Sequence, residues 1–180
     1  MDAVNGADFY IGVDGGVISN CLVARNYRSG AAGGGPAVTV GGAAVMENCT
    51  IVTNTLNAGS GVVSAGSTAT VRNSVIAGNV GRDGVLYPAY TGTAAAFVRC
   101  AGDGDEEINE NCYLGTPATF FTDFAALNYT PFVGSVLENR GQMPVVAASA
   151  DLAGNPRVIG RIDIGAFECQ RLPGLRIFFR

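Results

Sequence analysis

The chain has 180 residues and a formal net charge of −4; only 14% of its residues are charged, while 26 are Gly. All 11 basic residues are Arg and there is no His, which excludes a histidine general base, a Ser-His-Asp triad, a lysine Schiff base and a histidine-liganded metal. The acidic balance argues against a nucleic-acid-binding surface, and no apolar run reaches the roughly 18 residues that a membrane-spanning helix needs.

The N-terminus carries no recognisable targeting segment. Met1 is followed by Asp-Ala-Val-Asn-Gly, without the basic region and apolar stretch of a signal peptide. Because the chain opens inside a repeat, we interpret residue 1 as the start of a fragment. On this interpretation an export signal and further repeats lie upstream.

A nine-residue pattern occurs three times, at residues 18–26, 46–54 and 71–79. Its consensus is aliphatic-x-Asn-Cys/Ser-x-aliphatic-small-x-Asn, and short β-branched runs bounded by Gly, Asn and Ser are typical of strands and turns. A period in the twenties indicates a solenoid, whose repeats bury their apolar faces by stacking. We therefore predict an all-β, right-handed parallel β-helix of about three to four coils over residues 1–100.

Two columns of Asn follow from this alignment. We interpret both as structural ladders that hold the coils in register, because Asn tolerates left-handed corners and bonds neighbouring backbone. The columns consist of Asn20, Asn48 and Asn73, and of Asn26, Asn54 and Asn79. Cys21 and Cys49 occupy one slot of consecutive repeats, which predicts a buried stack of small side chains. The insertions at 27–35 and 56–59 are expected to form loops at one corner, where ligand contacts usually lie.

The repeat weakens after Asn79 and is followed by an acidic loop. Its carboxylates offer enough oxygen ligands for a calcium ion, although the loop lacks an EF-hand order and an alternative is a merely solvated loop. The candidate ligands are Asp103, Asp105, Glu106, Glu107 and Glu110. Cys100 and Cys112, on either side of this loop, could close a disulfide in an exported protein, which leaves Cys169 unpaired.

Residues 101–180 are expected to form an irregular capping module that packs on the coils as part of one structural unit. Residues 116–146 are rich in aromatics, as expected of a segment that closes the open end of a solenoid and protects its strand edges. The last segment, 172–180, is predicted to be an apolar strand packed back on the body, or else an attachment tail.

The stretch 151–168, DLAGNPRVIGRIDIGAFE, is the most specific in the chain. It closely resembles the closing segment of bacterial surface and secreted parallel β-helix proteins that end in a choice-of-anchor type module after repeats reading N-C-x-I-x-x-N. The resemblance implies an exported or cell-surface bacterial protein. Some members of this family are adhesin-like, and relatives in the wider fold act on polysaccharides.

The charged residues of this stretch alternate with apolar ones. We interpret Arg157, Asp163 and Glu168 as buried contacts that lock the module. The alternative is a ligand site for a sugar acid around Arg157.

Candidates for catalysis are few. Hydrolysis by two carboxylates requires acids held roughly 5 to 9.5 Å apart, and Asp14, Glu47 and Asp83 are the acids of the repeats that could line a groove. Arg72 is the candidate base for a calcium-assisted β-elimination. Glycan binding without catalysis would use exposed aromatic rings, for which the candidates are Tyr10, Tyr27, Tyr87 and Tyr90.

The sequence thus predicts a non-catalytic structural or adhesive segment of an exported bacterial surface protein, with a polysaccharide or cell-surface glycan as the expected ligand. The alternative is a polysaccharide lyase or glycoside hydrolase of the pectate-lyase-like type. No cofactor is required, and calcium is the single candidate. Unless a cap exists upstream, the first coil should present an open edge through which the chain dimerises or stacks end to end.

Overall fold

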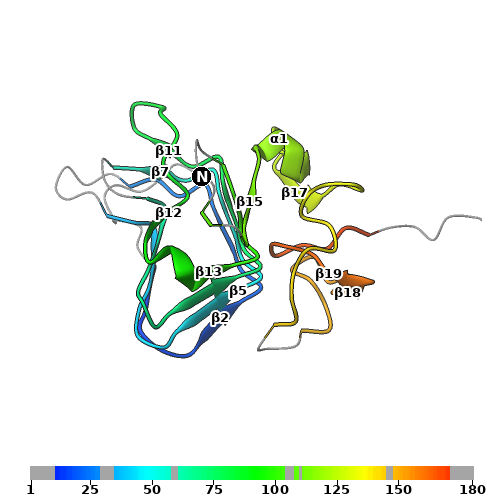
Figure 1. Ribbon diagram of the computed structural model, residues 1–180. Helices are drawn as coiled ribbons and strands as arrows, with labels where there is room; N and C mark the ends of the chain where they lie inside the picture. The colour runs from blue at the N-terminus through cyan, green and yellow to red at the C-terminus, as the bar shows by residue number, and fades with distance from the viewer. Residues whose placement is uncertain are drawn as a thin grey trace, which may run out of the picture.

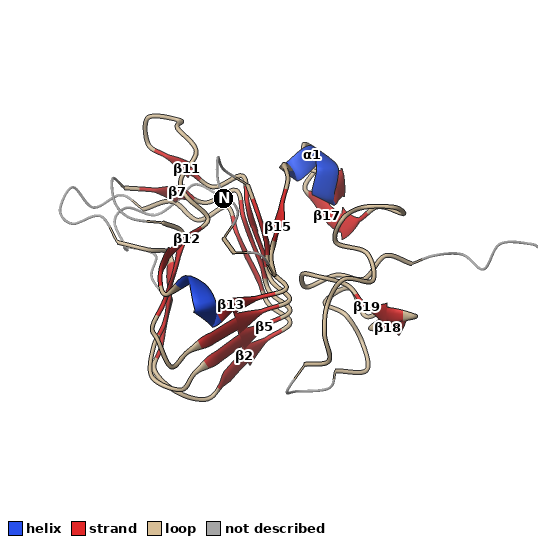
Figure 2. Cartoon of the chain, in the orientation of Figure 1, coloured by secondary structure: helices blue, strands red, loops and turns tan. Residues whose placement is uncertain are grey.

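The computed structural model describes residues 11–28, 35–57, 61–103, 108–109, 111–144 and 148–170. Over these residues the chain is a parallel β-solenoid of about three turns, which confirms the predicted all-β fold class (Figure 1). Two short helical pieces, η1 (Ala94–Ala96) and α1 (Pro117–Phe120), are the helices of the described part (Figure 2). Neither of them is long enough to cross a membrane.

Each coil contributes one strand to each of three parallel sheets. The first sheet consists of β1 (Ile11–Val13), β4 (Val38–Val40), β8 (Val63–Ala65) and β12 (Tyr90–Gly92). The second consists of β2 (Val17–Ser19), β5 (Val45–Glu47), β9 (Thr70–Arg72) and β13 (Phe97–Val98). The third consists of β3 (Leu22–Ala24), β6 (Thr50–Val52), β10 (Val75–Ala77), β14 (Ala101–Gly102) and β15 (Tyr113–Leu114). A short pair, β7 (Thr55–Leu56) and β11 (Val80–Gly81), follows the third sheet.

The three copies of the repeat lie in register. In the third sheet Val23 pairs with Ile51, and Ile51 pairs with Ile76. Equivalent residues of stacked coils are therefore direct neighbours at the strand spacing of about 4.8 Å. A repeat that returns the same residue type to the same slot consequently builds a continuous column of that type.

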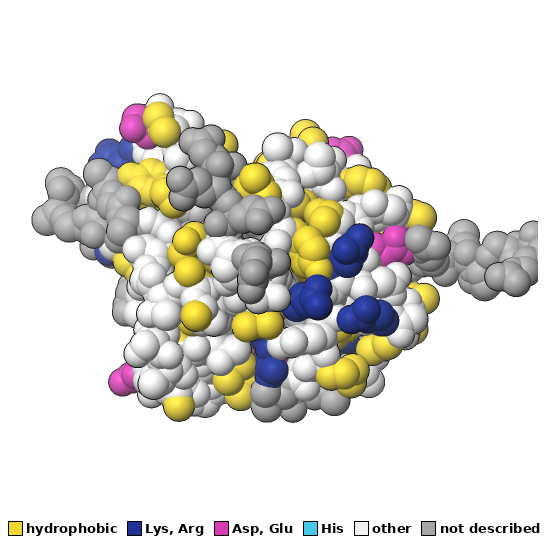
Figure 3. Space-filling model, in the orientation of Figure 1, with side chains coloured by type: hydrophobic (Ala, Val, Ile, Leu, Met, Phe, Trp, Pro, Cys, Tyr) yellow, Lys and Arg dark blue, Asp and Glu magenta, His cyan; other side chains and the backbone are white. Residues whose placement is uncertain are grey.

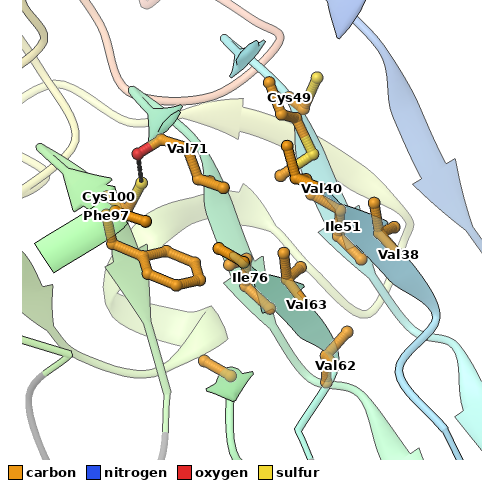
Figure 4. Close-up of a cluster of buried hydrophobic side chains, with 14 of the residues drawn as sticks. Val38, Val40, Cys49, Ile51, Val62, Val63, Val71, Ile76, Phe97 and Cys100 are labelled. Carbon is orange, nitrogen blue, oxygen red and sulfur yellow. Dashed lines mark hydrogen bonds between the residues drawn. The ribbon is translucent and has the colours of Figure 1, made fainter. Parts of the chain in front are cut away.

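The core is a stack of aliphatic columns inside the coils. Figure 4 shows Val38, Ile51, Val71 and Ile76 pointing into one cluster, and each is at most 1% exposed. Burying one such side chain stabilises the fold by roughly 1.5–3 kcal/mol, so stacking the coils is the main source of stability. The first described coil is less protected, because its inward side chains, such as Ile18, remain partly exposed.

Asn26, Asn54 and Asn79 form a hydrogen-bonded ladder. The Nδ2 atom of Asn26 donates to Oδ1 of Asn54 at 2.8 Å, and Nδ2 of Asn54 donates to Oδ1 of Asn79 at 2.8 Å. Each Oδ1 also accepts the backbone N–H of the preceding Asn, at 3.0 and 3.1 Å. The ladder thus satisfies backbone groups at a corner that is buried at Asn54.

The other Asn column takes a different role. Asn20, Asn48 and Asn73 all adopt left-handed backbone conformations, with φ between 48° and 58°, which Asn tolerates better than other non-glycine residues. Asn20 and Asn73 turn their side chains away from the coils and bond the C-terminal module: Nδ2 of Asn20 donates to the carbonyl of Ala150 at 3.0 Å.

The module lies along the side of the solenoid rather than over its end. It carries two small antiparallel pairs, β16 (Phe121–Asp123) with β17 (Asn128–Pro131), and β18 (Val158–Ile159) with β19 (Arg161–Ile162). Figure 1 shows it beside the third sheet. Its apolar residues pack on the outer face of that sheet; this second core contains Val52, Val75, Ala77, Ala101, Phe120, Phe121, Tyr129, Leu137 and Ile164.

The expectation that residues 116–146 close the open end is therefore wrong for the described part of the segment. The physical reason is the third sheet, whose strands are apolar on both faces and need a cover on the outside. A predicted apolar strand at 172–180 lies outside the described residues, so the structure does not test it.

Replacing Asn54 by Ala should lower the free energy of unfolding by about 2–4 kcal/mol, because it leaves buried partners in the coils above and below unsatisfied. Urea denaturation followed by circular dichroism measures this loss. Asn26→Ala is the matched control at the partly exposed end of the same ladder, and it should cost markedly less. Equal losses for the two variants would show that the ladder does not act through burial.

Candidate functional site

The densest group of buried charges lies in the stretch 151–168. Arg157 is 1% exposed, and its Nη2 donates to the carbonyl oxygen of Gly165 at 2.6 Å. Its Nη1 lies 4.0 Å from a carboxylate oxygen of Glu168. Burial lowers the pKa of Arg157, and the nearby Glu168, Asp151 and Asp163 oppose that shift.

The carboxylates of this group bind backbone amides. Asp163 accepts the N–H groups of Asn139 and Cys169, both at 2.6 Å. Asp151 accepts the N–H of Asn155 at 2.8 Å and that of Glu168 at 2.9 Å, and Glu168 accepts that of Asp163 at 3.1 Å. Each acid thus ties together two strands or turns of the irregular module, as a charge-assisted hydrogen bond can.

Strongly shifted acids next to an arginine are typical of active sites as well as of structural networks. Burial raises the pKa of Glu168 to about 8, and the charge of Asp163 adds to the shift. Burial likewise raises the pKa of Asp163, against the effect of its two amide donors. Both acids and Arg157 are only 1% exposed, so a polymeric substrate cannot reach them. The geometry supports the locking role over the sugar-acid site around Arg157.

The module is fastened to the solenoid by polar contacts at the corner between the second and third sheets. The backbone N–H of Gln142 donates to Oδ1 of Asn73 at 2.9 Å, while Nδ2 of Asn73 donates back to the carbonyl of Gln142 at 2.6 Å. The N–H of Ala166 donates to the hydroxyl of Thr50 at 2.9 Å. Gly165 permits this approach, because a Cβ there would lie 3.0 Å from the same hydroxyl.

The side chain of Asn48, in the same column as Asn73, is buried, and its Oδ1 accepts no hydrogen bond from the described residues.

The catalytic candidates do not assemble into a groove. Nε of Arg72 lies 3.0 Å from a carboxylate oxygen of Glu47, across adjacent strands of the second sheet. Glu47 is 0% exposed, however. Its carboxylate is therefore engaged in a buried ion pair and is not accessible as a reactive acid. Asp14 is exposed after β1, and Asp83 is exposed in the loop after β11, where it accepts the N–H of Val85. The structure brings together Glu47 and Arg72 but not a pair of accessible acids from this set.

The tyrosine candidates divide between core and surface. Tyr87 and Tyr90 pack against the main core, and the ring of Tyr90 meets that of Phe97 edge to face at 5.2 Å. Tyr27 is 48% exposed, with the guanidinium of Arg82 5.8 Å from its ring centre. It is therefore the one described ring of this set that a glycan could stack on. Tyr10 lies outside the described residues.

The acidic loop, for which the sequence leaves a calcium site and a solvated loop as alternatives, is described only in part. Asp103 is buried and accepts the N–H of Gly78, and burial raises its pKa. Its carboxylate thus serves the neighbouring coil rather than a solvent-exposed ligand site. The other candidates, Asp105, Glu106, Glu107 and Glu110, lie outside the described residues. Within the described part, no three Asp, Glu or Cys side chains are grouped as a metal site would require.

The cysteines line the inside of one corner. By the register of the third sheet, the column contains Cys21, Cys49, Ser74, Cys100 and Cys112. No disulfide joins any of the described cysteines, Cys169 included, so the structure does not contain the disulfide that Cys100 and Cys112 could form in an exported protein. Burial, reinforced by the hydrogen bond with Cys112, raises the pKa of Cys100, which keeps its thiol protonated.

A shallow hollow of about 510 Å³ lies on the outside of the module. Its lining comes from residues 116–118 and 121–125 and holds one carboxylate, Asp123, which accepts the N–H of Ala126 at 3.0 Å. One acid cannot perform the two-carboxylate chemistry of a glycosidase. The hollow thus offers an apolar surface without a reactive pair.

Comparison with known proteins gave no match: no family model, no curated protein and no solved structure is similar to this chain. The resemblance of residues 151–168 to the choice-of-anchor type module therefore stays a prediction.

The shifted acids predict how stability depends on pH. Glu168 has a folded-state pKa of about 8, above its ordinary value of 4.5, so the folded state holds a proton that the unfolded state has lost between these values. The contribution of Glu168 to the free energy of unfolding is fully present below pH 4.5 and is lost as the pH rises through 8. This contribution should therefore fall from pH 5.5 to pH 8.5, as measured by urea denaturation of the native chain against Glu168→Gln.

Glu168→Gln should flatten this dependence, because the neutral amide cannot titrate. Asp14→Asn, which removes an exposed carboxylate, is the control and should leave the slope as it is. A slope that is the same in the native chain and in Glu168→Gln would contradict the assignment.

Proposed function

We propose that the chain is a non-catalytic segment of an exported bacterial surface protein, with a structural or adhesive role and a glycan as its ligand. The proposal that the chain is non-catalytic rests on one observation: the buried acidic side chains of the repeats and the module are already hydrogen-bonded or ion-paired. Asp151, Asp163 and Glu168 each accept backbone N–H groups, and Glu47 is fully buried against Arg72. The resemblance of the tail supports the exported, bacterial origin.

The architecture suits a scaffold. Short strands in register give a stiff body, and the described corners around Tyr27 and residues 81–88 carry exposed side chains on that body. Val85 and Leu86 are 61% and 52% exposed on a loop that folds back through a bridge between Val80 and Leu86. Exposed loops on a rigid frame are common sites of ligand contact.

The purified chain should bind a polysaccharide without degrading it. The test incubates it with polygalacturonate, alginate and xylan, with and without calcium, and measures unsaturated products, reducing ends and co-sedimentation. We expect co-sedimentation with at least one polymer and no product above the level of a heat-denatured sample. Product formation would instead support the alternative, a polysaccharide lyase or glycoside hydrolase.

We also propose that the first coil mediates self-association. In the first sheet Ile11 and Val13 bond β4, so the backbone N–H and carbonyl of Gly12 point to the opposite edge, where no other described strand pairs with β1. The inward side chains of this coil are also only partly buried. A free edge with apolar side chains favours pairing with another chain.

Sedimentation velocity over a roughly hundredfold concentration range should show a species larger than the monomer that grows with concentration. Gly12→Lys should shift the equilibrium to monomer, because a charge on an edge strand opposes pairing. Thr39→Lys is the matched control, since Thr39 is the register partner of Gly12 one coil inside the stack. A monomer at every concentration would contradict the proposal.

A further inference from the structure

We propose that Arg99, Arg140 and Arg161 form a binding site for the acidic groups of a polyanionic polysaccharide, at the junction between the last coil and the module. The inference rests on the proposed glycan-binding function and names its ligand class and its site. We refer to these three residues together with Tyr113 as the junction site.

Tyr113 is the centre of the junction site. Arg99 directly follows β13, and its Nη1 donates to the hydroxyl of Tyr113 at 2.6 Å. The guanidinium of Arg140, from the module, lies over the ring of the same tyrosine at 5.6 Å from its centre. A partly buried ring on β15 thus holds two cations from distant parts of the sequence next to each other.

The backbone fixes the positions of Arg99 and Arg140 relative to each other. Arg99 occupies the corner slot of Asn73 on the next coil, as the pairing of Val98 with Arg72 shows, and both adopt a left-handed conformation. Asn73 holds the backbone of Gln142 through two hydrogen bonds. Arg140 precedes Gln142 by two residues, so its backbone is held close to Asn73. The corner slot of Asn73 lies one coil away from that of Arg99.

Arg161 extends the site along the module. Its backbone N–H donates to Oδ1 of Asn139 at 2.7 Å, which fixes the start of β19 beside the residue that precedes Arg140. The side chains of Arg140 and Arg161 are exposed. Figure 3 shows basic side chains gathered on this face, over the module and its border with the coils.

The charges of the junction site are not neutralised within the described part of the chain. Arg72 and Arg157 face Glu47 and Glu168, whereas none of the three junction arginines lies within ion-pair distance of a described carboxylate. This concentration of positive charge occurs on a protein whose net charge is −4. It attracts anions locally, although the molecule as a whole repels them.

The chemistry of the side chains selects the ligand group. A guanidinium presents a planar fork of N–H donors that matches a carboxylate or a sulfate ester. Tyr113 holds the guanidinium groups of Arg99 and Arg140 in place before a ligand binds, which lowers the entropic cost of ordering these side chains. The site is open and lies on a surface, so a polymer that carries an acidic group on successive sugars can engage several arginines at once.

The test measures binding to polygalacturonate and to sulfated dextran by affinity electrophoresis or titration calorimetry at low salt, with neutral dextran as the uncharged polymer. Arg140→Gln and Arg161→Gln should each weaken binding to the polyanions about three- to tenfold, and the triple variant with Arg99→Gln should weaken it by about a hundredfold or more. The dependence on salt should become shallower in every variant, because fewer charges are engaged. The carboxylated and the sulfated polymer distinguish which acidic group binds best.

Arg25→Gln is the matched control. Arg25 is exposed, carries the same charge and has the same left-handed backbone as Arg99, but it lies on the first coil. It should leave affinity unchanged. Because Arg140 and Arg161 are exposed, their variants should keep the native circular dichroism spectrum, which separates lost binding from lost folding.

Unchanged affinity in Arg140→Gln and Arg161→Gln would overturn the inference, even if the polymer binds elsewhere and the glycan-binding function stands. Binding to vesicles containing phosphatidylglycerol, with none to the polyanions, would also overturn it in favour of a membrane surface. Degradation of the bound polymer would overturn the non-catalytic function instead, a result that the product assays detect separately from affinity.

Discussion

The structure depends on the in-register stacking of coils at the strand spacing of about 4.8 Å. Because each residue lies over its own equivalent, a buried polar group in one coil has to be satisfied by the same slot of the next. Asn meets this condition, since its amide both donates and accepts along the stack. Asn54 is the clearest case: it bonds Asn26 on one side and Asn79 on the other, and its Nδ2 also donates to the carbonyl of Val23. A slot that held an apolar side chain would leave corner backbone groups unpaired.

The same residue type serves a second purpose six residues earlier in each repeat. There the corner is left-handed in each repeat, the amides of Asn20 and Asn73 bond the main chain of the module, and at Asn73 both polar atoms do so. The irregular module lacks long strands of its own, so it obtains order from two sources. One is the solenoid corner, and the other is its own buried acids, which replace missing sheet bonds with carboxylate–amide bonds. This explains why a group of three acids and an arginine can be structural.

The sequence predicted the coils and their columns because a repeat places equal residues in equal slots. It misplaced the module, although a signal was present: Val38-Thr39-Val40 alternates, whereas Val75-Ile76-Ala77 is apolar on both faces, which is typical of a strand covered on both sides. The ion pair of Glu47 and Arg72 follows from the register, yet the burial of Glu47 depends on packing that no spacing reveals. The meeting of Arg99 and Arg140 could not be predicted, because it depends on where an irregular segment docks.

That dependence links binding to folding. Arg99 comes from the coils and Arg140 from the module, so the junction site exists only while the Asn73 corner holds the module in place. A ligand that binds both arginines binds the docked state and not the undocked one, and by mass action it stabilises the docked state. The acids of the module do not oppose this binding. They are buried and accept backbone N–H groups, so they do not neutralise the arginines at the surface. The division between buried acids and exposed arginines lets an acidic protein present a basic surface.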